Sequence, residues 1–283
     1  MAKIPKKKLG IGSMILLGTM IAGFVSNPVL SLDRIYGEYA ALLSAYVDSQ
    51  GMVNYRTLKG NPQGLEAFQA ALAQTTPEVY QQWRDEEKIA FWINAYNALT
   101  LKAIIDHYPI RASFFKGFVY PRNSIRQIPG VWDSRRFPVM GKSMTLDEIE
   151  HGVLRQDFNE PRIHLALVCA AMGCPPLRNE PYEGDKLDQQ LDDQARVFLA
   201  NPKKFRLDQG RRKVLLSPIF KWFGGDFVKT YGTDKAFQGF SPEERAVLNF
   251  LSGYVSDSDR DYLRQGKYTI SYLDYDWSLN QQR

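Results

Sequence analysis

Both cysteines of the chain lie close behind one of its three histidines, at positions 169 and 174 after His164. An imidazole beside a thiol can take the thiol proton and leave a reactive thiolate, the nucleophile of cysteine-dependent enzymes. The apolar run over residues 162–168 predicts a short strand, and a turn that stops at Pro175 and Pro176 follows it. The spacing therefore favours His164 as a base and Cys174 as a nucleophile at the end of that strand.

The same two cysteines also fit a disulfide. An even cysteine count in an exported protein favours pairing, and the short spacing can close if a turn brings the two Cα atoms within about 7 Å. On a strand, Cys169 would point to the face opposite His164, because their separation is odd. Cys169 is thus the poorer partner for the histidine. A free functional thiol at Cys174, a Cys169–Cys174 disulfide and a pair of inert buried thiols are all open at this point.

Two further polar pairs are candidates for the same site. Glu150 and His151 lie on a predicted helix, where they would orient His164 or form an acid–base pair, or else belong to an exposed helix face. Asn94 and Asn97 are three residues apart in an apolar helical segment, hence on one face, and buried amides must find hydrogen-bond partners. We expect Asn94 in the catalytic site and a structural role for Asn97.

Metal and cofactor sites are not expected. The chain has neither the H-E-x-x-H nor the C-x-x-C spacing typical of zinc sites, and it has no glycine-rich phosphate loop. A serine-based site is disfavoured too, because no G-x-S-x-G motif is present.

The first 31 residues are typical of a signal peptide. Four lysines precede an uncharged apolar run over residues 9–25, and Val29 and Ser31 suit a cleavage site. We expect export to the periplasm or the extracellular space, with a retained signal anchor as the alternative and the membrane contacted only through that segment. The remaining residues carry 32 basic and 31 acidic side chains, so no nucleic-acid partner is expected.

Residues 32–283 are predicted to form a single α+β domain. Residues 85–107 begin with three acidic residues, are apolar on most sides and stop before Pro109, which predicts a central, buried helix. We expect this helix to pack on a modest, mostly antiparallel sheet. Further elements are predicted as helices over 32–47, 65–73, 145–155, 187–199 and 241–254, half a hairpin over 136–142, a hairpin over 205–216 and a strand over 268–273.

Five separated blocks lie in order along the chain: FWINAYNAL at 91–99, IEH at 149–151, the segment 163–176 with His164 and both cysteines, residues 220–227, and YDWSLN at 275–280. Taken together, they resemble the family named domain of unknown function 547, and the resemblance runs from about Tyr39 to Asn280. The resemblance implies a relation to papain-like and transglutaminase-like cysteine hydrolases. There a cysteine opens the central helix, and a histidine on a strand and an Asp or Asn follow. This chain departs from that order because its thiols come last, which implies a rearranged or inactive site.

The sequence thus favours an exported thiol-dependent hydrolase or acyltransferase that acts on an amide or small peptide-like substrate, with His164, Cys174 and Asn94 in one cleft. The alternative is a non-catalytic binding module of the cell envelope in which Cys169 and Cys174 form a disulfide.

Overall fold

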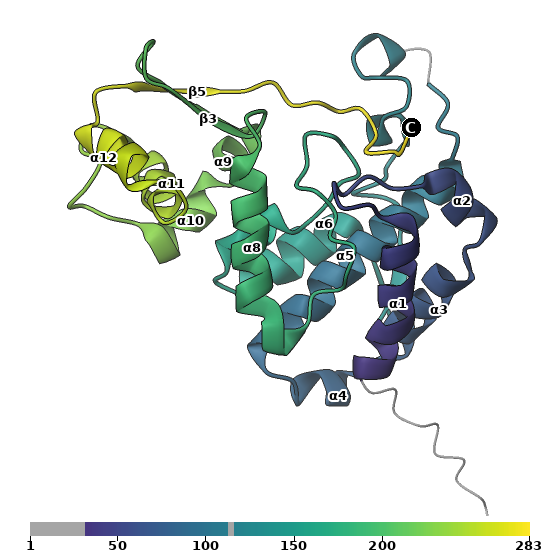
Figure 1. Ribbon diagram of the computed structural model, residues 1–283. Coiled ribbons are helices and arrows are strands. Elements are labelled where there is room, and N and C mark those ends of the chain that lie inside the picture. Colours follow the sequence, from purple (N-terminus) through teal and green to yellow (C-terminus); the bar gives the residue numbers. More distant parts are fainter. Residues whose placement is uncertain (1–31, 113–115) are drawn as a thin grey trace, which may run out of the picture.

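The computed structural model describes residues 32–112 and 116–283 (Figure 1). The predicted signal peptide over residues 1–31 lies outside this part of the chain. Across the described residues, every helix is too short or too polar to cross a membrane.

The described chain combines groups of helices with a few short strands, as expected for an α+β fold. The principal helices are α1 (Leu32–Tyr46), α2 (Tyr55–Gly60), α3 (Gln63–Gln74), α4 (Pro77–Gln81), α5 (Asp85–His107), α6 (Leu146–Ile149), α7 (Arg155–Asp157), α8 (Leu187–Ala200), α9 (Pro218–Trp222), α10 (Gly224–Tyr231), α11 (Pro242–Ser252) and α12 (Asp257–Gln265). The strands are β1 (Phe137–Val139), β2 (Lys142–Met144), β3 (Phe205–Asp208), β4 (Lys213–Leu216) and β5 (Thr269–Tyr272). Four short 3-10 helices, η1 (Lys116–Phe118), η2 (Ile125–Gln127), η4 (Pro161–Leu165) and η5 (Gly184–Lys186), and one π-helical turn, η3 (Glu150–Leu154), complete the described chain.

Helix α5 is the centre of the molecule, as predicted (Figure 1). The Glu87 carboxylate caps its start by accepting the backbone N–H of Arg84 at 2.7 Å, and the cis Tyr108–Pro109 peptide follows its end. Nearly every side chain between Ile89 and Ile105 is buried. The main neighbours of α5 are helices α2, α3, α6 and α8 and the η5 turn, so the expected packing on a sheet is wrong. Strands of three or four residues are too short to cover a helix of 23 residues.

The strands form two small sheets. β1 and β2 make an antiparallel hairpin, with Phe137 opposite Met144. β3 and β4 make the predicted second hairpin, and β5 adds to β4 in parallel, which gives the order β3-β4-β5. The chain after β5 then runs back toward the N-terminal helices (Figure 1). There Asn280 accepts a hydrogen bond from the Tyr55 hydroxyl at 2.6 Å, which ties the end of the chain to its beginning.

Two hydrophobic clusters fill the interior. One surrounds α5, and the other lies among α8, α10 and α11. The η4 turn joins them, because Ile163 belongs to the first cluster and Leu165 to the second. Tyr275 packs against both clusters. A cavity that lies between η4 and Tyr275 is therefore supported by packed side chains on each side.

The predicted strand over residues 162–168 is not formed. Pro161 starts the η4 turn, and the chain beyond Leu165 is irregular. The amide of Asn97 on α5 takes the place of a neighbouring strand: its Nδ2 donates to the Ala166 carbonyl at 3.1 Å and its Oδ1 accepts from the Val168 N–H at 2.8 Å. A helix side chain thus satisfies backbone groups that a sheet would otherwise pair.

Candidate functional site

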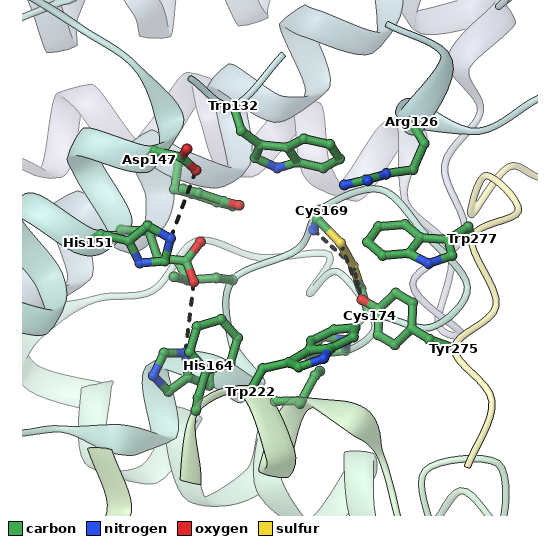
Figure 2. A pocket seen from close by; sticks show the side chains of 16 residues that line it. Arg126, Trp132, Asp147, His151, His164, Cys169, Cys174, Trp222, Tyr275 and Trp277 are labelled. Atoms are coloured by element: carbon green, nitrogen blue, oxygen red, sulfur yellow. Dashed lines mark hydrogen bonds and ion pairs between the residues drawn. A yellow bond between two sulfur atoms is a disulfide. The ribbon is translucent and has the colours of Figure 1, made fainter. Parts of the chain in front are cut away.

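A cavity of about 270 Å³ opens between the π-helical turn η3, the η4 turn, the cysteine segment and the C-terminal chain (Figure 2). It gathers ionisable groups at one end and aromatic rings with both sulfurs at the other. The lining residues are Tyr96, Arg126, Trp132, Asp147, Glu150, His151, His164, Leu167, Cys169, Cys174, Pro175, Ile219, Trp222, Phe223, Tyr275 and Trp277.

His164 is the best-oriented ionisable group of the cavity. It is 3% exposed, and its ring stacks on Phe223 with 3.9 Å between centroids. Its Nε2 lies 2.7 Å from Oδ2 of Asp226, whereas Nδ1 has no hydrogen-bond partner and lies 3.9 Å from Oε1 of Glu150. An ionised Asp226 accepts the Nε2 proton, which leaves the lone pair on Nδ1. The ring is therefore set up as a base on its Nδ1 side.

Arg155 holds Asp226 in place and in its charged form. Its Nε and Nη2 donate to the two carboxylate oxygens at 2.6 and 2.9 Å. Burial alone would raise the pKa of Asp226, but the hydrogen bonds from His164 and Arg155 outweigh burial and hold that pKa well below its usual range. Burial lowers the pKa of His164, which favours the neutral imidazole with a free lone pair.

Glu150 faces His164 from the π-helical turn. It is 8% exposed, and burial raises its pKa to about 7, against the opposing effects of Tyr96 and Arg155. A carboxyl group with such a pKa can be protonated or ionised near neutral pH. Glu150 and His164 thus form a pair of groups able to exchange protons with a bound molecule.

His151 lies at the rim of the same end. Its Nδ1 is 3.0 Å from Nη1 of Arg155, and its Nε2 is 3.9 Å from Oδ1 of Asp147. Burial and the nearby Arg155 lower its pKa. The structure therefore brings the candidates Glu150 and His151 into one cavity with His164, where Glu150 is buried and His151 stays exposed to solvent.

Asn94 does not belong to this cavity, which corrects its expected catalytic role. Its Nδ2 donates to the carbonyl of Tyr182 at 2.7 Å, and its Oδ1 accepts the N–H of the same residue at 2.9 Å. Asn97 is saturated in the same way by the chain after η4. Both amides are buried, and their hydrogen bonds hold neighbouring loops against α5. This structural role was expected for Asn97 but not for Asn94.

Cys169 and Cys174 form a disulfide in the wall of the cavity, and neither is a free thiol. The Tyr275 hydroxyl lies 3.3 Å from the sulfur of Cys169 and 3.1 Å from that of Cys174, and the backbone N–H of Cys169 donates to the Cys174 sulfur at 3.0 Å. Cys169 does not lie on the face opposite His164, contrary to the prediction, because the segment is not a strand and both residues line the cavity.

The cysteine loop is closely fitted to the C-terminal chain. A Cβ atom on Gly173 would lie 2.6 Å from the Tyr275 ring, so the ring sits flat on the loop where only glycine leaves room. The buried ammonium group of Lys204 donates to the carbonyls of Met172 and Cys174, the latter at 2.9 Å. These contacts hold the sulfurs in one place.

Aromatic side chains form the other end of the cavity (Figure 2). Trp277 contacts Tyr275 and Trp222, with ring centroids 4.6 and 6.3 Å apart, and Trp132 lies 6.3 Å from Trp277. The blocks around residues 220–227 and 275–280 pointed toward this region, but Arg126 and Arg155 were missed. Arg155 contacts Asp226, which lies 71 residues away in the sequence, and Arg126 contacts Trp277 near the C-terminal end of the chain.

Within residues 32–112 and 116–283, the side chains form no cluster that could hold a metal ion. Comparison with curated proteins and with solved structures gave no match. The family model described as "Protein of unknown function, DUF547" matches residues 80–199, which include α5, His164 and both cysteines. Over residues 80–199, the chain is therefore similar to the DUF547 family, as the sequence blocks indicated.

Proposed function

We propose that the cavity is the active site of a thiol-dependent hydrolase or acyltransferase that acts on an amide or peptide-like substrate. The observation that carries the proposal is His164: its Nε2 is held by Asp226 while its Nδ1 is unpaired beside a cavity that both sulfurs line. A base fixed by a carboxylate, with its free nitrogen toward a nucleophile, is the arrangement that cysteine and serine hydrolases share.

Cys174 is the proposed nucleophile once the disulfide is reduced. Its sulfur already has two hydrogen-bond donors, the Cys169 N–H and the Tyr275 hydroxyl, and such donors stabilise a thiolate. A dithiol reductant would supply the two electrons and two protons that convert the disulfide to two thiols. The disulfide form then represents the resting, oxidised enzyme.

The reaction would follow the order of other thiol enzymes. Nδ1 of His164 takes the proton of Cys174, and the thiolate attacks the carbonyl carbon of the amide. His164 then gives its proton to the leaving amine as the C–N bond breaks, which leaves a thioester on Cys174. Water hydrolyses this thioester in a hydrolase, and a second amine takes up the acyl group in an acyltransferase.

A second candidate function is a binding module, and the Cys169–Cys174 disulfide favours it. In that case the disulfide fixes the cavity wall permanently, and the aromatic end binds a ligand without turnover. The two functions differ in whether a thiol is ever needed.

The test compares turnover of a library of short peptide amides by the protein before and after reduction. If the protein is a thiol-dependent enzyme, we expect turnover only after reduction. Turnover should be lost in Cys174→Ala and partly retained in Cys169→Ala. Iodoacetamide should label Cys174 of the reduced protein faster than Cys169, and His164→Ala should slow that labelling. Turnover that is absent in both redox states would leave the binding module as the function. Turnover that survives Cys174→Ala would exclude Cys174 as the nucleophile and overturn the proposed thiol chemistry.

We also propose that the protein is exported. The lysine-rich start and apolar run support export, and a disulfide is expected to persist in an oxidising compartment rather than in the cytosol. Mass spectrometry of the native protein tests this: a chain that begins near Leu32 in the exported fraction supports cleavage, and an intact chain in the membrane fraction supports a signal anchor.

A further inference from the structure

Arg126 lies in an aromatic frame at the end of the cavity opposite the ionisable pair. Its guanidinium carbon is 4.6 Å from the ring centroid of Tyr120, 5.1 Å from that of Trp277 and 5.5 Å from that of Trp132. Its Nη2 donates to the Tyr120 hydroxyl at 2.7 Å. These contacts fix the plane of the guanidinium and shield it from water on its faces.

The charge of Arg126 is not neutralised within the described part of the chain. Other half-buried arginines are paired: Arg155 with Asp226, Arg162 with Glu160, and Arg178 with acidic neighbours. Among the arginine side chains that the structure describes, Arg126 is the only one that is partly buried and has no carboxylate within 4.0 Å. A guanidinium has five N–H donors, and among the described residues the Arg126 side chain donates only to the Tyr120 hydroxyl.

We infer that Arg126 binds a carboxylate group of the substrate, so that the site takes a short peptide-like amide with a free C-terminal carboxylate. This inference rests on the proposed function for the chemistry, but the binding step does not need it. A planar guanidinium binds a carboxylate through two parallel hydrogen bonds. A guanidinium that is already fixed in place and weakly hydrated loses little conformational freedom and little hydration when it binds.

The charge and volume of the cavity further restrict which ligands can bind. Asp147 and Glu150 also line it, so a ligand with one negative charge is better accepted than a doubly charged phosphate. The volume of about 270 Å³ fits a few residues of a peptide, not a folded protein. Figure 2 shows the sulfurs between Arg126 and His164 in this view, which suits cleavage near the carboxylate-bearing end.

The test measures binding to the oxidised, full-length protein by the fluorescence of the cavity tryptophans. The probes are acetyl-alanyl-alanine and its C-terminal carboxamide, which differ only in the charged group. The wild type should bind the acid about tenfold more tightly than the amide. Arg126→Gln should abolish this preference and leave the amide affinity unchanged. Arg122→Gln is the matched control, because Arg122 is exposed and close in sequence.

Three results would overturn the inference: no binding of either probe by the wild type, equal binding of both, or an unchanged preference in Arg126→Gln with the melting temperature of the wild type. Inorganic phosphate is tested as a competitor. If it binds through Arg126 as tightly as the acid probe does, then the site is a general anion site and not a carboxylate site. Because the oxidised protein has no free thiol, failure of the thiol chemistry leaves these outcomes unaffected.

Discussion

Asp226 and His164 are joined by a hydrogen bond of 2.7 Å although they lie 62 residues apart, on α10 and on the η4 turn. The same carboxylate accepts two hydrogen bonds from Arg155. Because Asp226 must then be ionised, the imidazole keeps its proton on Nε2 and directs a lone pair from Nδ1. The contact therefore fixes both the orientation and the tautomer of the proposed base.

Asp226→Asn should disturb that tautomer. An amide can donate to Nε2, which moves the ring proton to Nδ1 and removes the base, so we expect turnover by the reduced protein to fall about 10²–10⁴-fold. We also expect a loss of about 1–2 kcal/mol of stability, because Arg155 loses its carboxylate. Asp234→Asn, which removes an exposed partner of Arg245, is the control for a change of charge alone. Activity equal to the wild type would contradict the role of Asp226.

Glu150→Gln should change how stability depends on pH. The pKa of Glu150 is raised to about 7 in the folded protein, against 4.5 for the free group. Below pH 4.5 both states are protonated, so the raised pKa has no effect on stability there. Between pH 4.5 and about 7 the unfolded state loses its proton first, so the free energy of unfolding of the wild type falls as pH rises. Glu150→Gln should thus be more stable than the wild type at pH 8, by up to about 3 kcal/mol, and nearly equal at pH 4.5. Urea unfolding across this range measures it, and a pH-independent difference would argue against the raised pKa.

The sequence predicted local elements well and long-range relations poorly. The acidic start and proline stop bounded α5, and the two-residue turn signal placed the β3–β4 hairpin. The strand at His164 was wrong, because Asn97 from α5 pairs backbone groups that a sheet was expected to pair. Local apolar pattern does not reveal such a partner.

The candidate site shows the same limit. Three residues of the cavity were predicted as site candidates because their side chains can exchange protons and they lie near the cysteines: His164, Glu150 and His151. Arg155 and Arg126 were missed, since an arginine in a sequence looks the same whether it is solvated or placed in a cavity. Their importance follows only from what the fold brings to them.

Asn94→Ala should cost stability without changing the chemistry of the cavity. The substitution leaves the buried N–H and C=O of Tyr182 without partners, and we expect a loss of about 2–4 kcal/mol in the free energy of unfolding. Iodoacetamide labelling of the reduced, folded protein should keep its wild-type rate. A labelling rate that falls as it does in His164→Ala would restore Asn94 to the active site.

The Cys169–Cys174 disulfide should stabilise the oxidised protein by about 2 kcal/mol, because it closes a short loop in the unfolded chain. Cys169→Ala should therefore lower the midpoint of unfolding in the absence of reductant. With a dithiol present, the wild type and this variant should unfold at nearly the same denaturant concentration. A difference of the same size in both conditions would mean that the thiols contribute through packing and not through the bond.

Tyr275→Phe tests the environment of the sulfurs most directly. Burial raises the pKa of Tyr275, so its hydroxyl stays protonated and can donate to Cys174 at 3.1 Å. One hydrogen bond to a thiolate corresponds to about a tenfold change in the acid dissociation constant of the thiol. Removing it should raise the thiol pKa of Cys174 in the reduced protein and slow iodoacetamide labelling at pH 7 several-fold.

The ring of Tyr275 stays in place in this variant, so the cavity shape is kept and binding of a neutral probe should not change. Tyr254→Phe is the control, because its hydroxyl donates to Asp192 and the residue does not line the cavity. If both tyrosine variants label at the wild-type rate, the hydroxyl does not stabilise a thiolate. The Cys169 N–H would then be the remaining donor to the sulfur of Cys174.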